Sequence, residues 1–344
     1  MRPPGTRSLI DGTMADGGVS IQTAPAPPLL NGHPQVFCMS WIALTLTSAV
    51  LLGIYDIAKK QSVRGNAVPM VLLCNVATAA AIWLVPVVVA GLATLGWVTL
   101  PADWHGQQLI SLSLREHGLV FFKSVLVGCS WTTAFFALKH LPISIAAPIR
   151  ATSPLWTIAL AVLVMGERPS GLQWLGIAVV LAAFVFFSLV GAKESIHFHR
   201  NRWVLLTIIA TLTGSASAVY DKVLLQQVGI PPAALQAWFS FYLVPVMLPL
   251  AVRWYVRDRT SVPFEWRPAI PLIAIFLLAA DFAYFLALAD PEALVAIISP
   301  IRRTSIVIPF AYGIVHLSEA NWRLKTACVV ATLFGALLLS MTAS

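Results

Sequence analysis

Charged residues are scarce in this chain. Only 10% of its 344 residues are Asp, Glu, Lys or Arg, whereas 58% are hydrophobic and the mean hydropathy is +0.83. A soluble domain carries about a quarter charged residues, with which it covers a surface in water. The shortage therefore excludes a water-soluble fold and predicts a protein that lives in a lipid bilayer.

Cysteine and histidine are also few, and neither forms a recognisable site. The four cysteines fall within apolar stretches without a CxxC pair, and the seven histidines are scattered. Metal and redox motifs need closely spaced ligands, which are missing from this pattern. The sequence also offers no nucleophile, base and orienting group at a common depth. We therefore expect no metal, no cofactor and no enzymatic activity.

Long apolar runs dominate what the chain does contain. Ten stretches have the length of a membrane-crossing helix, roughly 18 to 25 residues each. They cover residues 37–58, 68–90, 117–139, 142–165, 172–190, 203–225, 233–255, 268–289, 292–317 and 324–342. Their apolar residues are continuous and not alternating, which argues against a β-barrel. The prediction is an all-α integral membrane fold with ten transmembrane helices, preceded by a proline-rich, disordered tail at 1–36.

The basic residues favour one side of a ten-helix arrangement. Four connections on that side hold Lys59, Lys60, Arg64, Lys193, Arg200, Arg202, Arg253, Arg257, Arg259, Arg267, Arg323 and Lys325. The positive-inside rule then places these connections in the cytoplasm and both termini outside it, in a bacterial-type inner membrane. The formal charge of +8 thus reflects membrane orientation, and we expect no nucleic-acid partner.

Two nearly identical hexapeptides indicate an internal duplication. PIRATS begins at Pro148 and PIRRTS begins at Pro300, 152 residues later. Each copy would hold five helices, and because five is odd the second copy enters the membrane inverted. We therefore predict two inverted five-helix repeats, residues 37–191 and 203–342, an architecture that suits alternating access.

Arginines lie deep inside two of the predicted helices. A central arginine costs about 2.5–3.5 kcal/mol on insertion scales, so Arg150, Arg302 and Arg303 need partners or a polar cavity. A proline two residues before Arg150 and Arg302 breaks each helix, as is typical of a midplane binding site. The arginines either form buried ion pairs with aspartates or face a substrate path. Both can hold, because a resting ion pair can exchange for a substrate anion.

The substrate-binding candidates follow from this pattern. Arg150 and Arg302 are the symmetric cations, and Asp281, within the eighth apolar run, is the candidate counter-ion to Arg302 or Arg303. The hydroxyl groups of Thr152 and Thr304 can donate to a substrate or bond back to their own helix.

Arg303 is the one cation of this region that the repeat does not duplicate. It follows Arg302 at about 100° around the helix, so at most one of the two should point squarely into the site. The repeat selects Arg302, and we expect Arg303 to form an ion pair with Asp281.

Two Tyr-Asp pairs, Tyr55-Asp56 and Tyr220-Asp221, lie near helix ends at a spacing of 165 residues. They are candidates for gating or charge pairing. One alternative is an interfacial anchor with a solvated carboxylate, and the other is a gate or a proton-coupling group. Lys123 has no acidic neighbour in sequence and either snorkels to the interface or joins the path.

Two further features concern packing. Glu167 and its counterpart Glu319 end helices, where a carboxylate opposes the helix dipole, so each should lie near the N-terminus of the next helix. Ala327, Ala331 and Gly335 form a small-residue stripe in the last apolar run, which serves internal packing or a homodimer contact.

These residues also resemble a known family. LWTIALAVLVMGERPSGLQWLGIAVVLAAFVFFSLVG, from Leu155 to Gly191, is similar to the closing segment of an EamA domain. The second half is similar in outline, although Gly-Glu-Arg has become Ser318-Glu319-Ala320. Two such domains resemble the ten-helix transporters of the drug/metabolite transporter superfamily over about 37–342. The resemblance implies a transporter with helices 5 and 10 at its periphery, and it assigns no substrate residue.

The residues and the resemblance together predict a permease. It would move a small metabolite by alternating access, and the arginines favour a metabolite with an acidic group. The alternative is a flippase for a lipid or lipid-linked headgroup, which a groove open to lipid would favour. The expected partners are thus the small-molecule substrate and the bilayer.

Overall fold

The computed structural model describes residues 41–63, 65–99, 106–140, 149, 152–191 and 202–308, with single positions between 312 and 338. Every regular element within these ranges is a helix. The tail expected at 1–36, residue Arg150 and most of the last predicted helix lie outside the described residues.

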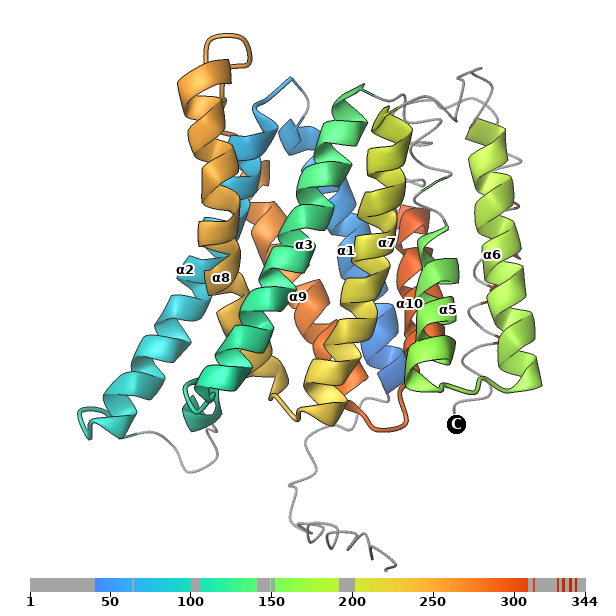
Figure 1. Cartoon of the computed structure of the whole chain (residues 1–344), viewed down its shortest axis with the longest axis horizontal. Coiled ribbons are helices and arrows are strands. Elements are labelled where there is room, and N and C mark those ends of the chain that lie inside the picture. Colours follow the sequence, from blue (N-terminus) through green and yellow to red (C-terminus); the bar gives the residue numbers. More distant parts are fainter. Residues whose placement is uncertain are drawn as a thin grey trace, which may run out of the picture. The chain divides into compact units, whose positions relative to one another are not determined.

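Most helices follow the apolar runs closely, whereas the helices at Ser153–Met165 and Val295–Arg303 cover only part of the runs 142–165 and 292–317 (Figure 1). In the first half they are α1 (Trp41–Val63), α2 (Val68–Thr94), α3 (Leu114–His140), α5 (Ser153–Met165) and α6 (Gly171–Gly191). In the second half they are α7 (Arg202–Lys222), α8 (Pro232–Arg253), α9 (Ala269–Ala289) and α10 (Val295–Arg303). Short helical turns are Gly106–Leu109 and Thr304–Ile306 (3-10), and Val223–Gln227 and Trp254–Asp258 (π).

Among the described residues, five segments are long and apolar enough to cross a membrane. They are Trp41–Val63, Val68–Thr94, Arg202–Gln227, Pro232–Asp258 and Ala269–Ala289. The predicted all-α fold is confirmed for the described residues. The count of ten helices and the two repeats stay predictions from the sequence.

Proline and glycine set the ends of the helices that matter for the site. Prolines lie in the first turns of α2, α5 and α8: Pro69, Pro154 and Pro232. Backbone N–H groups in a first turn have no acceptor within the helix, so proline costs no helical hydrogen bond there. Gly166 ends α5 with φ of 68°, a left-handed conformation that favours glycine. The chain turns away there, and Glu167 follows directly.

Helices of the first half pack mainly on helices of the second half. The most extensive contacts join α1 to α9, α3 to α7 and α2 to α8, and α5 packs on both α7 and α10. Figure 1 shows α3 running alongside α7. In the proposed repeats α1 corresponds to α7 and α3 corresponds to α9. The contact of α1 with α9 is then equivalent to the contact of α7 with α3. Such pairing is what a two-fold axis between the proposed repeats would require.

Hydrogen bonds identify one end of the bundle. The side chain of Asn66, after α1, donates to the Glu265 carbonyl at 2.7 Å and accepts from the Glu265 N–H at 2.9 Å. We call this end, which also carries Arg257 and Arg267, the basic end. The 21 residues of α9 span about 30 Å, so the turn from α9 to α10 lies at the opposite end, here called the α10 end.

The small-residue stripe has one described internal contact. A Cβ atom on Gly335 would lie 2.6 Å from Val180 Cγ2 and 3.1 Å from the Gly176 carbonyl oxygen, both in α6. Gly335 therefore serves close packing within the chain. A homodimer remains a prediction.

Candidate functional site

A cavity of about 310 Å³ lies between the two halves. Its wall takes residues from α1, α3, α5, α7, α8, α9 and α10. Charged side chains gather in this wall: Asp56, Lys59, Lys123, Asp221, Asp281, Arg302 and Arg303. Such charges interact strongly where protein and lipid exclude water, and a polar substrate entering the cavity would meet them.

Arg302, in this wall, is held by three groups. It donates through Nη2 to Asp281 Oδ1 at 2.7 Å and through Nε to Ser48 Oγ at 3.0 Å. Its guanidinium lies over the Tyr284 ring, 4.1 Å from the ring centroid. The side chains of Arg302 and Asp281 keep 19% and 20% exposure, so this ion pair faces the cavity without being sealed in the protein.

A second ion pair, between Lys123 and Asp221, is more deeply buried. Their side chains are only 3% and 7% exposed. The Lys123 ammonium also lies 4.4 Å from the Phe239 ring centroid and 5.0 Å from that of Phe285. The sequence offered no partner for Lys123 because Asp221 comes from α7, 98 residues further along the chain.

The expected ion pair between Arg303 and Asp281 is wrong. Asp281 pairs with Arg302, and Arg303 donates to Ser153 Oγ at 3.0 Å. Both arginines also reach the cavity wall, although we expected only one to do so. The long guanidinium side chain reaches around the helix, so a 100° separation does not exclude two neighbours from one cavity.

The two threonines bond back to their own chain segments. Thr152 Oγ1 donates to the Ile149 carbonyl at 2.6 Å, and Thr304 Oγ1 donates to the Ile301 carbonyl at 2.7 Å. The serines that follow them, Ser153 and Ser305, line the cavity. Of the two alternatives for Thr152 and Thr304, the structure has the backbone bond.

The two Tyr-Asp pairs differ in position. Tyr55 and Asp56 both line the cavity, and so does Asp221. Tyr220 instead donates to the Leu119 carbonyl at 3.3 Å and packs edge-on against Phe122. Both residues of the Tyr55-Asp56 pair thus line the cavity, whereas only Asp221 of the second pair does so.

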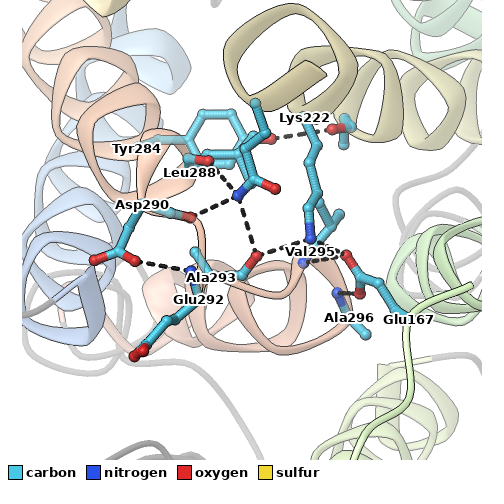
Figure 2. Close-up of polar contacts among 11 residues, drawn as sticks. Glu167, Lys222, Tyr284, Leu288, Asp290, Glu292, Ala293, Val295 and Ala296 are labelled. Carbon is cyan, nitrogen blue, oxygen red and sulfur yellow. Dashed lines mark hydrogen bonds and ion pairs between the residues drawn. The ribbon is translucent and has the colours of Figure 1, made fainter. Parts of the chain in front are cut away.

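Glu167 lies where the sequence did not place it. We expected its carboxylate near the start of the helix that follows it in sequence, α6. Figure 2 shows it at the start of α10, where Oε1 accepts from the Val295 N–H at 2.9 Å and Oε2 from the Ala296 N–H at 3.0 Å. Val295 lies 128 residues further along the chain, so no local sequence pattern could identify it as the partner. The sequence did indicate that the Glu167 carboxylate needs a helix N-terminus, because a negative charge at the end of α5 is unfavourable.

Comparisons with known proteins give this arrangement a context. The model of the EamA-like transporter family matches residues 39–189. This match covers the first half of the chain, where the sequence resembled an EamA domain. The first half of the chain is therefore similar to a family of transporters, as the resemblance implied.

Relatives extend the similarity into the second half. The pseudopaline exporter CntI from two strains of Pseudomonas aeruginosa is 23% identical over 247 residues, which cover 69% of this chain and 83% of the exporter. A solved protein crystal structure shares the fold, with a TM-score of 0.62 and 15% identity over 88% of this chain and 97% of that one. The similarity to that structure thus includes helices beyond the matched residues 39–189.

The polar lining of the cavity is made by the described residues. Within them, no group of three or more His, Cys, Asp or Glu side chains could hold a metal ion. The cavity wall instead combines ion pairs with hydroxyl groups and aromatic rings, which can hold and orient a polar molecule.

Proposed function

We propose that this EamA-like protein is a multi-pass permease that moves a small metabolite with an acidic group by alternating access. The observation that carries the proposal is the accessible Arg302–Asp281 ion pair in the cavity wall between the two halves. The exporter named among the relatives supports transport of a small molecule.

The ion pair can exchange one anion for another. An arginine guanidinium binds carboxylate and phosphate oxygens well, and Arg302 already holds one carboxylate oxygen of Asp281. Breaking a buried pair is costly if a charge is left alone, so Arg302 should leave Asp281 only when a substrate anion replaces it. The nearby Ser153 and Arg303 can then contact other polar groups of the substrate.

The buried Lys123–Asp221 pair has a different part in this proposal. Its exposure is a fraction of that of the Arg302–Asp281 pair. It would hold α3 against α7 while the substrate exchanges at Arg302. We place the basic end in the cytoplasm, on the positive-inside rule.

The test starts from a ligand screen, because a compound that binds only the folded state raises its unfolding temperature. Acidic metabolites that stabilise the purified chain are then followed as radiolabelled substrates in proteoliposomes. Arg302→Gln should lower uptake about tenfold or more, the loss of roughly 1.4 kcal/mol or more of binding energy. Arg253→Gln, at the exposed end of α8, should leave uptake unchanged.

Unchanged uptake by a folded Arg302→Gln protein would refute the binding role. The flippase alternative has its own readout in the same vesicles. Movement of a fluorescent lipid headgroup, without uptake of any soluble acid, would replace the permease proposal.

A further inference from the structure

The contacts of Glu167 tie the first half of the chain to the second. Its side chain is 3% exposed and accepts both N–H groups at the start of α10. It also accepts from Lys222 Nζ, at the end of α7, at 2.8 Å. One carboxylate from the α5–α6 connection therefore holds two helices of the other half.

Two side chains of the second half complete this cluster (Figure 2). Lys222 Nζ also donates to the Ala293 carbonyl at 2.9 Å. Gln226 Nε2 lies within hydrogen-bond distance of the carbonyl oxygens of Leu288, at 2.9 Å, and Asp290, at 2.6 Å. We call Glu167, Lys222 and Gln226, with the turn from Leu288 to Ala296 that they bind, the latch.

The latch lies directly behind the cavity wall. Val295 lines the cavity while its own N–H is bonded to Glu167. Asp221, which precedes Lys222, lines the cavity as well. Both wall residues are buried, at 1% and 5% exposure, whereas Asp56 and Lys59 in the part of the wall nearer the basic end are half-buried.

The chemistry of the latch gives it two distinct states. While it is made, Glu167 lies in the positive field of the α10 N-terminus and neutralises Lys222. Partial separation would leave a buried carboxylate, a buried ammonium and two N–H groups without partners, which is strongly unfavourable. Only a fully open arrangement, with water around these groups, satisfies them again.

We propose that the latch is the gate that closes the cavity at the α10 end, with Glu167 as the residue that holds it shut. This inference rests on the proposed transport function, because a gate needs a path. The latch also sets the position of α10, whose last turn carries Arg302 and Arg303. A movement of α10 that opens the gate would therefore also move Arg302 and Arg303.

The duplication suggests which of the two states of the gate is the more stable. Glu319 is the counterpart of Glu167 in the second repeat, but the position 165 residues before Lys222 is Ile57. A latch built by Glu319 in the inverted state would therefore lack this lysine. The state with the α10 end closed should be the more stable one.

The experiment measures access to the cavity from each membrane face. In a full-length variant whose native cysteines are replaced, Ser217→Cys puts one thiol in the cavity wall on α7. A membrane-impermeant maleimide is applied to intact cells or to inside-out vesicles, and Glu292→Cys, exposed in the α9–α10 turn, identifies which preparation presents the α10 end.

Glu167→Gln should raise labelling of the Ser217→Cys thiol from the α10 end about tenfold or more, equivalent to a shift of roughly 1.4 kcal/mol between states. Labelling from the basic end should fall. Gln226→Met removes donors to the turn without leaving a charge buried, so it should shift labelling in the same direction even if Glu167→Gln fails to fold. Gln227→Met, its exposed neighbour, is the matched control and should change nothing.

Unchanged labelling from the α10 end in folded Gln226→Met protein, and in Glu167→Gln if that folds, would overturn the gate and leave Glu167 as a helix cap. The assay needs no substrate, so it separates the two proposals. A labelling shift without uptake of any acidic metabolite would support the latch and defeat the permease. Uptake without a labelling shift would defeat the latch alone.

Discussion

At the scale of single residues, the two ion pairs of the cavity should respond differently to mutation. Lys123→Met leaves Asp221 as an uncompensated buried charge and should cost about 3–5 kcal/mol of stability. Replacing both residues, Lys123→Met with Asp221→Leu, removes both charges and should recover most of this loss. The measurement is the unfolding temperature of the purified protein, compared across the single and double variants.

Arg257→Met, at the exposed basic end, controls for the loss of a positive charge alone. It should leave the unfolding temperature within error of the unaltered protein. A double variant no more stable than Lys123→Met would show that the pair contributes through more than its mutual attraction.

These residue pairs also show which part of the site the sequence predicts and which part it does not. The need for partners could be predicted, because an arginine or lysine inside an apolar run is costly. The choice of partner could not, since it depends on how separate helices are rotated against each other. Asp281 was named as a counter-ion candidate for Arg302 or Arg303, and only the structure shows that Arg302 is its partner.

At the scale of helices, α3 begins with a capping box. The Ser113 hydroxyl donates to Glu116 Oε2 at 2.7 Å, and the Glu116 N–H donates back to Ser113 Oγ at 3.3 Å. Ser113→Ala should therefore lower the free energy of unfolding by about 1 kcal/mol, seen as a lower unfolding temperature. Ser111→Ala, two residues earlier and joined only by a long 3.5 Å bond, should have little effect. Equal losses for the two variants would contradict the cap.

The helix ends were the part of the fold that local sequence specified best. Apolar length placed α2 and α9 within a few residues, because crossing the hydrocarbon requires a run of that size. Ser113-x-x-Glu116 and Ser170-x-x-Gln173 mark the starts of α3 and α6 by a local rule that needs no tertiary knowledge. The Glu167 contact with α10 depends on the packing of the two halves, and no local pattern specifies that.

At the scale of the whole molecule, the described helices of each half have their main packing partners in the other half. α1, α2 and α3 make their most extensive contacts with α9, α8 and α7, so a first half alone would leave these faces, including the Lys123 side chain, without partners. We therefore expect residues 1–191 expressed alone to be aggregated or degraded, and co-expression with residues 192–344 to yield a stable complex of both pieces. Size-exclusion chromatography with one fluorescent tag on each piece measures this directly. A monodisperse first half would mean that its own helices suffice, and the cross-half ion pairs would then serve function more than assembly.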